Sequence, residues 1–428
     1  MSFRSITIII TFFISIVYCQ GLINVFGLGH FVDNESSMNA GQGLNKILPA
    51  YKKNVSILNP STWPNLKYTQ LSMSYNASKI AIPILNEYSS LSSAYWIIPI
   101  RGKYAFGLSI LPYTNQNIIV NDTTTTMIYT FDDTLSYNRD YQRSGGITAF
   151  EVSSGMRINK KINLGAKLHL LFGSSRQKVS ITLKGNESWM SGSIIQSSRL
   201  RYSGMLMQGF LSFYPDKNTS LMFSFKFPIK SLDGLYNKYF LFQDNNNNGF
   251  HDSYGYDFPY PSDVNHQNMI RLKSLHSPLK YAFGLDRSIY NRINLSMELT
   301  SFKEYGTIPD ILDLGIYDFI NISNSISLSL IRYPDDLSIN WFDKFTFRSG
   351  MKYSSKKLNF SKISISEIGF SFGIGFKFKP VGNQIDINYF IGLREYSQSF
   401  DSEIIHQFQA GISLADIWFV KRRQKRNG

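Results

Sequence analysis

Strict alternation of apolar and polar residues recurs along the chain. In the cleanest run, Ile368–Phe378, Ile and Phe take every second position, and Gly, Ser and Lys fill the others. Residues two positions apart share one face of a β-strand, so this strand has one apolar and one polar face. The same pattern occurs in Ile162–Phe172, Leu221–Phe227, Leu279–Leu285, Ile293–Leu299, Ile385–Leu393 and Phe408–Leu414. A membrane barrel strand needs roughly 9–11 residues, apolar outward and polar inward, so the pattern predicts an all-β transmembrane antiparallel barrel.

Turn residues and polar stretches separate the strand candidates. Tyr214–Thr219 predicts a tight turn, because Pro215 presets φ and Asn218 tolerates positive φ. Three polar stretches are expected to be long external loops: Thr114–Ser144, Ser231–Gln267 and Tyr305–Phe342. The first alternating run is Leu66–Ser78. We expect the barrel to occupy residues 66–419 with about 12–16 strands, and with an even number of them, as in single-chain bacterial barrels.

The N-terminus has the features of an export signal. Arg4 precedes the apolar run Ile6–Val17, which is too short to span a bilayer as a helix. Residues 1–19 are therefore predicted to be a signal peptide cleaved after Cys19. The alternative is lipidation of Cys19, which Tyr18 disfavours because that processing requires a small residue there. Residues 20–65 lack sustained alternation, and Pro60 and Pro64 exclude a regular central strand, so we expect a plug folded inside the barrel mouth.

Composition supports an exported barrel. The 428 residues are 15% aromatic, which suits the aromatic girdles at membrane interfaces, and the formal net charge is +14. An export signal argues against nucleic acid as the partner of this charge and favours outer-membrane lipid headgroups or anionic solutes. The basic residues 420–428 are expected to be a solvated tail. Because Cys19 is the only cysteine, the mature chain has no disulfide, thiolate metal site or cysteine nucleophile.

One polar stretch has the spacing of a calcium loop. Asp244, Asn246, Asn248 and Asp252 would supply oxygen ligands, with Gly249 at the sharp turn. Gly255 stands where an EF-hand loop has its bidentate Glu, so an Asn-rich external loop without metal is the favoured interpretation. No other cofactor is expected.

Enzymatic motifs find little support. Gly369–Gly373 matches the nucleophile-elbow letters but lies in a regular strand, where that mechanism cannot operate. The six histidines show no metal-ligand spacing. Lys167, His169 and Glu298 fall on faces expected to point into the lumen. We predict no catalytic residues and no enzymatic activity.

The N-terminal segment carries a family resemblance. A small-residue stretch, Ser37–Leu44, is followed by Val55–Ser61, which contains Asn59 and Pro60, and then by the first strand at Tyr68–Ser72. This order resembles the outer-membrane transport family typified by the long-chain fatty acid transporter FadL, in which Ala usually stands at the position of Ser61. Three later segments are also similar to that family: Ala105–Tyr113, Leu164–Gly173 and His276–Leu285.

The resemblance implies a 14-stranded barrel with an N-terminal plug in the bacterial outer membrane. It implies passive uptake of hydrophobic compounds such as long-chain fatty acids, by plug rearrangement and lateral release into the membrane beside a strand kink. Asn59 and Pro60 would set the plug conformation. Pro112 would form the kink, or would merely end its strand, and both alternatives stay open. The other functional hypothesis is a PorV-type interaction barrel that binds a protein partner of a secretion or surface-attachment system.

Overall fold

The structure is a computed structural model and describes residues 22–32, 36–80, 86–100, 102–121, 126–129, 134–184, 192–246, 250–252, 257–260, 269–290, 292–307, 318–335, 338, 340–379, 382–397 and 402–416. The expected signal peptide and basic tail lie outside these residues. None of the helices in this part of the chain is long and apolar enough to cross a membrane.

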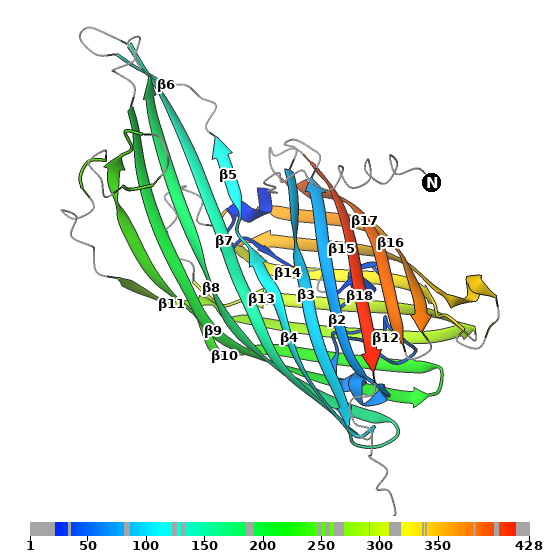
Figure 1. Cartoon of the computed structure of the whole chain (residues 1–428). Coiled ribbons are helices and arrows are strands. Elements are labelled where there is room, and N and C mark those ends of the chain that lie inside the picture. Colours follow the sequence, from blue (N-terminus) through cyan, green and yellow to red (C-terminus); the bar gives the residue numbers. More distant parts are fainter. Residues whose placement is uncertain are drawn as a thin grey trace, which may run out of the picture.

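Fourteen antiparallel strands form a closed barrel (Figure 1). Neighbouring wall strands pair in chain order, and β18 pairs with β2 from Ile405↔Ile80 to Asp416↔Thr69, which closes the wall. The expected fold class and strand number are confirmed. The wall strands are β2 (Thr69–Ile80), β3 (Asn86–Ile100), β4 (Tyr104–Asn115), β7 (Thr134–Arg157), β8 (Ile162–Lys184), β9 (Gly192–Asp216), β10 (Thr219–Gln243), β12 (Pro278–Tyr290), β13 (Ile293–Glu304), β14 (Ile320–Arg332), β15 (Phe345–Leu358), β16 (Ser364–Lys379), β17 (Asn383–Tyr396) and β18 (Glu403–Asp416).

Short elements complete the described chain. The short strand β1 pairs with β4, β5 and β6 pair with β7, and β11 pairs with the far end of β10. These elements and the short helices are η1 (Leu22–Val25), β1 (His30–Phe31), α2 (Ser37–Ala40), η2 (Pro60–Asn65), β5 (Ile118–Asn121), β6 (Thr126–Tyr129), β11 (Ile270–His276) and η4 (Trp341–Lys344). Long connections join the strands at the end of the barrel near Asn115 and Glu304, which we call the outer end because external loops of such barrels are the longer ones.

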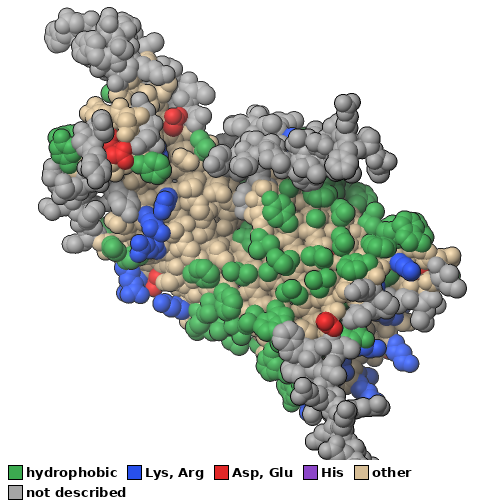
Figure 2. All heavy atoms as spheres, in the orientation of Figure 1, with side chains coloured by type: hydrophobic (Ala, Val, Ile, Leu, Met, Phe, Trp, Pro, Cys, Tyr) green, Lys and Arg blue, Asp and Glu red, His purple; other side chains and the backbone are tan. Residues whose placement is uncertain are grey.

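The wall shows the reverse of a soluble protein's burial pattern. On β17, Ile385, Ile387 and Tyr389 are exposed by 42–50%, whereas Asp386 and Asn388 are at most 2% exposed. Apolar side chains form a band across the face drawn in Figure 2, with Lys and Arg toward its margins. An apolar exterior around a polar interior is what a barrel presents to lipid.

The N-terminal segment (residues 22–68) lies inside the barrel, as the blue ribbon in Figure 1 shows. It starts at the outer end, where β1 joins β4, and reaches the opposite end at η2, which packs against β4, β7 and β8. Met38, Ile47, Ile57 and Trp63 on this segment are at most 1% exposed. The segment occupies the lumen that an open pore would leave to water.

Lumen-facing glycines make room for this segment. A Cβ atom at Gly155 or Gly165 would clash with the backbone of Pro60 or Ser61, and one at Gly350 would clash with the backbone of Gly43. Without side chains, these wall positions let the N-terminal backbone approach the strands closely. Gly155, Gly165 and Gly350 are therefore docking positions for the segment.

Three stretches that were expected to be loops contain strands, so those expectations were wrong. Tyr305–Phe342 holds the whole of β14, whose Ile326, Leu328 and Leu330 are exposed while Ser327 and Ser329 are buried. Thr114–Ser144 holds β5, β6 and the start of β7, and Ser231–Gln267 holds the outer part of β10. The outer parts of β7 and β10 extend beyond the rest of the wall (Figure 1). A strand that lies outside the bilayer no longer needs an apolar face. The turn expected at Tyr214–Thr219 is confirmed, because β9 ends at Asp216 and β10 begins at Thr219.

Candidate functional site

The wall changes its pairing at Pro112. Strand β3 pairs with β4 from Ile100↔Tyr104 to Ala94↔Ile110, and the described pairing stops there. Beyond Pro112, the register between β4 and β7 shifts, and β1 pairs with Thr114 and Asn115 of β4. Proline has no N–H to donate to a neighbouring strand, which fits a position where two strands separate. The N-terminal segment thus lies beside β4 at the point where β3 no longer pairs with β4.

Polar contacts hold the start of the N-terminal segment at the outer end. The backbone N–H of Val32 donates to the carbonyl of Tyr113 at 3.1 Å. Arg143, which is 2% exposed, donates from Nη1 to the carbonyl of Gly27 at 2.7 Å and from Nη2 to Gln116 Oε1 at 2.6 Å. A buried guanidinium with these acceptors fixes residues near Gly27 to the wall.

A lumenal cavity of about 100 Å³ lies beside Pro112. Its apolar lining comes from both the N-terminal segment and the wall, and comprises Phe31, Leu44, Leu111, Tyr113, Phe302 and Ile320. Its charged lining contains several lysines and one carboxylate: Lys46, Lys226, Lys280, Lys352, Lys356 and Glu298. The cavity therefore combines an apolar wall with a cationic surround.

Glu298 ties the N-terminal segment to the wall. Its carboxylate accepts the backbone N–H of Lys46 at 3.0 Å and that of Ile47 at 2.9 Å, and the side chain is 3% exposed. Because these N–H groups occupy both carboxylate oxygens, Glu298 serves here as an anchor for the segment. The lysines around the cavity leave its surroundings net positive.

Three aromatic residues of the cavity lining, Phe31, Tyr113 and Phe302, form a cluster with the ring of His276. The Phe31 ring stacks on His276 at 5.2 Å between centroids and lies 5.7 Å from Phe302. The hydroxyl of Tyr113 and Nε2 of His276 are 2.8 Å apart, and Nδ1 of His276 bonds to Glu304. This aromatic cluster joins β1 to β4, β11 and β13, so movement of the N-terminal segment would break it.

A second cavity of about 60 Å³ adjoins the separation of β3 from β4. It is lined by Ser90 and Ser92 of β3 and by Pro112 and Asn115 of β4. His30, Val32 and Pro112 line both cavities. The two cavities therefore lie next to each other at Pro112, one in the lumen and the other beside the place where β3 and β4 separate.

Neither cavity can hold a long hydrophobic ligand as it stands. Sites for small molecules typically measure about 300–1,000 Å³, and an apolar cavity of roughly 150 Å³ binds a molecule of the size of benzene. The cavities of about 100 and 60 Å³ are smaller than that. A long-chain ligand would need the N-terminal segment or its side chains to move.

The structure places Asn59 and Pro60 at the start of η2. Asn59 is its N-cap: Oδ1 accepts the backbone N–H of Ser61 at 3.1 Å, and Nδ2 donates to the carbonyl of Ile47 at 3.0 Å. Pro60 occupies the first turn. Backbone N–H groups have no partner within the helix there, so the missing N–H of proline costs no hydrogen bond. Ser61 donates to Asn59 and lies 2.6 Å from the hydroxyl of Ser212 on β9. The roles of Asn59, Pro60 and Pro112 in transport stay predictions.

The expected calcium loop is described in part. Asn248 lies outside the described residues, whereas Nδ2 of Asn246 donates to Asp252 at 2.8 Å and Asp244 is 2% exposed. Asp257, which was not among the expected ligands, accepts the backbone N–H of Asp252 at 2.8 Å. Within the described residues, no group of three or more His, Cys, Asp or Glu is arranged to hold a metal ion. Calcium binding stays a prediction.

The charged residues that were expected to face the lumen do so. Lys167 lies 2.9 Å from one oxygen of Glu151, and Nδ1 of His169 lies 2.7 Å from the other. All three side chains are at most 3% exposed. A carboxylate therefore already partners Lys167, which makes it a structural cation of the lumen.

Sequence reasoning missed the aromatic cluster, β1 and the separation of β3 from β4. Strand β1 has only two residues, too few to show an alternating pattern. The aromatic cluster joins residues that are far apart in the chain. Pro112 was the one available signal. The lumen-facing glycines were visible as the polar partners in the alternating runs, but their contacts with the N-terminal segment were not.

Solved structures with a similar fold are channels. The CymD monoaromatic hydrocarbon channel has a TM-score of 0.53 and 12% sequence identity, over 89% of this chain and 97% of that one. The P. putida toluene transporter TodX has a TM-score of 0.54 and 11% identity, over 91% of this chain and all of that one. A TodX mutant channel gives a TM-score of 0.55 at 13% identity, over 90% of this chain and 99% of that one. These similarities confirm the FadL-type fold.

Sequence comparison gives the family. No curated protein matches the chain. The family model described as BamG matches residues 1–425 and thus spans the N-terminal segment and the whole barrel. The chain belongs to the BamG family.

Proposed function

We propose that the protein is a passive outer-membrane channel for hydrophobic compounds. The observation that carries the proposal is the pair of cavities that share Pro112 in their linings, because the larger lies in the lumen and the smaller adjoins the separation of β3 from β4. A ligand would enter from the outer end, displace part of the N-terminal segment, and leave sideways into the bilayer past Pro112. The channel-type fold shared with CymD and TodX supports this route.

The charged lining favours amphipathic anions over neutral hydrocarbons. Lysines surround the cavity, and its one carboxylate is occupied by backbone N–H groups. A carboxylate head could lie near these lysines while the chain contacts Leu44, Leu111 and Phe302. Long-chain fatty acids have this form, so we propose them as the first compounds to test.

The experiment replaces Pro112 by Ala. The new N–H can donate to β3, which should narrow the separation and lower the rate of labelled oleate uptake by about tenfold, or ~1.4 kcal/mol of barrier. Uptake is measured in a host strain that lacks its own fatty acid channel, with toluene as a neutral probe. Pro99→Ala is the matched control, because Pro99 lies in β3 where β3–β4 pairing is intact. Equal uptake by the two variants, or no oleate uptake by the unaltered protein, would contradict the proposal.

A second candidate is an interaction barrel that binds a protein partner of a secretion or surface-attachment system. The projecting outer parts of β7–β10 favour it, because they extend beyond what a bilayer covers and offer a surface on the outside (Figure 1). The tightly filled lumen also suits a protein that conducts nothing. Loss of a stoichiometric protein partner on shortening β7–β10, with no oleate uptake in the unaltered protein, would support this candidate.

A further inference from the structure

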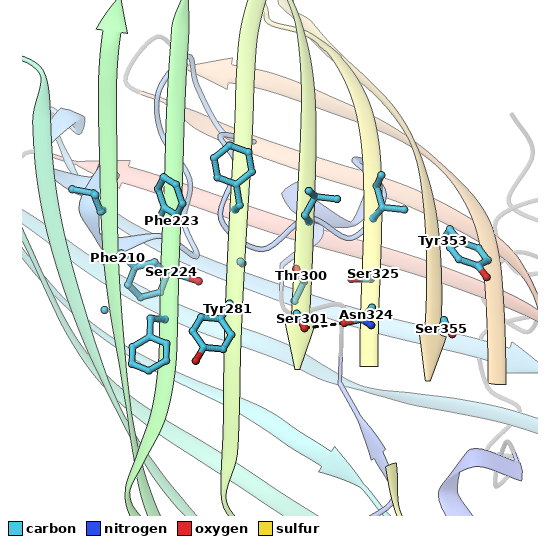
Figure 3. Close-up of a pocket in the computed structure, with 17 residues that line it drawn as sticks. Phe210, Phe223, Ser224, Tyr281, Thr300, Ser301, Asn324, Ser325, Tyr353 and Ser355 are labelled. Atoms are coloured by element: carbon cyan, nitrogen blue, oxygen red, sulfur yellow. Dashed lines mark hydrogen bonds between the residues drawn. The ribbon is translucent and has the colours of Figure 1, made fainter. Parts of the chain in front are cut away.

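The outer surface of the wall carries a hollow of about 930 Å³, larger than either lumenal cavity. It crosses β9, β10, β12, β13, β14 and β15 (Figure 3). Its apolar sides are formed by exposed residues that face away from the lumen: Phe223, Phe225, Tyr281, Leu299, Ile326 and Tyr353. The volume lies in the range of sites that bind small organic molecules, roughly 300–1,000 Å³.

The hollow has a row of polar residues along its outer edge, which is unusual for a surface that faces lipid. Ser301, Asn324 and Ser355 lie side by side on β13, β14 and β15, because the register pairs Ser301 with Asn324 and Asn324 with Ser355. Figure 3 shows the three side chains in one row. Polar groups on the lipid face are costly unless they find partners. The hydroxyl of Ser301 donates to Oδ1 of Asn324 at 2.8 Å, and Nδ2 of Asn324 has no partner among the described residues.

Two lysines lie directly above this row at the outer end of the wall. Lys303 and Lys357 both pair with Ile322, so they flank β14 two strands apart, or about 10 Å. Both side chains are exposed, and neither has a carboxylate partner in the described part of the chain. The Lys303 ammonium lies 4.9 Å from the centre of the Tyr305 ring. Lysine beside an exposed aromatic ring marks the level of the lipid headgroups.

From top to bottom, the wall therefore presents two cations, a row of hydrogen-bonding groups and an apolar hollow. We propose that this surface binds one phosphorylated, multiply acylated lipid of the outer leaflet. The phosphate would bind Lys303 and Lys357, the amide of Asn324 would donate to a linkage oxygen of the lipid, and an acyl chain would lie between Tyr281 and Tyr353. The site is separate from the proposed transport path, which runs through the lumen.

The charges favour a lipid over a second copy of the chain. Two copies in one membrane stand the same way up, so a two-fold contact through this face would bring the Lys303 and Lys357 rims together at the same height, where they repel. A lipid phosphate has the complementary charge. Ser355 pairs with Ser366 of β16, and Ser366 pairs with Glu395 of β17. Beyond Ser355, the first carboxylate along this row is therefore that of Glu395, two strands away.

The test is native mass spectrometry of the full-length mature protein in detergent, titrated with diphosphoryl lipid A. We expect one copy to bind. The double variant K303Q/K357Q should weaken binding roughly 30-fold, since each lysine near a membrane surface adds about one factor of five in attraction to anionic lipid. The variant S301L/N324L should also weaken it, by filling the hollow with side chains that a bilayer tolerates.

Controls separate a site from general attraction. The variant K160Q/K161Q removes the same charge from the opposite end of the barrel and should bind like the unaltered protein. Retention of the folded barrel on unheated gels shows that each variant has folded. The proposal is overturned if K303Q/K357Q binds normally, if the control variant is equally weakened, or if phosphatidylethanolamine binds as tightly as lipid A. A protein dimer that S301L/N324L abolishes would assign the surface to a second copy instead.

Discussion

At the residue scale, glycines on the inner face of the wall decide where the N-terminal segment can lie. Gly350 faces the backbone of Gly43, and Gly155 faces that of Pro60, each too close for a Cβ atom. We expect Gly350→Ala to destabilise the protein by about 1–3 kcal/mol, the usual cost of overpacking. Heat denaturation in detergent measures it. Gly209→Ala is the matched control, because nothing lies within 4 Å of a Cβ at that position; equal melting temperatures for the two variants would refute the docking role.

Asp318 stabilises the outer end through hydrogen bonds. Its carboxylate accepts the backbone N–H groups of Asn359 at 2.9 Å, Phe360 at 2.8 Å and Ser361 at 2.7 Å. Burial raises the pKa of this carboxyl, but the bonds from Phe360 and Ser361 outweigh burial and hold the pKa below its ordinary value of 3.8. A lowered folded pKa means that the stabilisation is complete above the unfolded pKa and is lost as pH falls through the folded one.

The prediction from Asp318 concerns amide exchange in the turn between β15 and β16. Protection of the Phe360 and Ser361 amides, corrected for intrinsic exchange, should fall as pH drops below about 4. Asp318→Asn should show the weaker protection at every pH and lose this dependence. A dependence that persists in Asp318→Asn would mean that another group controls the turn.

At the element scale, the N-terminal segment must move if the channel is to conduct a long ligand, because the cavities of about 100 and 60 Å³ are too small for one. The hydroxyls of Ser37 in α2 and Ser74 in β2 are 3.1 Å apart. A disulfide in S37C/S74C would tie the segment to the wall. Oxidation should lower oleate uptake by about tenfold, equivalent to ~1.4 kcal/mol, and reduction should restore it.

The wall offers a matched control for this cross-link. The hydroxyls of Ser72 in β2 and Ser413 in β18 are 3.0 Å apart, so S72C/S413C joins two wall strands to each other and not to the segment. Its uptake should not respond to oxidation. If oxidised S37C/S74C conducts normally, the segment does not need to move at α2, and the proposed gating is wrong.

The strands were predictable where lipid imposes alternation. Runs such as Ile368–Phe378 and Ile385–Leu393 lie within β16 and β17, because one face meets lipid and the other meets the lumen. The same signal was present in β14 but was missed, since its serines resemble loop residues. The outer parts of β7 and β10 gave no such signal, because above the bilayer neither face has to be apolar.

At the scale of the whole molecule, the candidate site depends on contacts between distant parts of the chain. The sequence resemblance pointed to Pro112, Asn59 and Pro60. Only the strand pairing in the structure reveals that β1 lies beside β4 at the point where β3 no longer pairs with β4. The aromatic cluster brings Phe31 to Tyr113, His276 and Phe302, which no local pattern encodes. The barrel could therefore be derived from periodicity, whereas the proposed path through it could be located only from the fold.

The central claim is that hydrophobic ligands pass from the lumenal cavity to the separation of β3 from β4. The most direct measurement is a crystal structure with a brominated long-chain fatty acid, in which anomalous scattering locates the bromine atoms. We predict bromine peaks among Leu44, Leu111 and Phe302, or beside Pro112, with the N-terminal segment displaced. Bromine peaks confined to the outer surface of the wall, with an unchanged lumen, would contradict it.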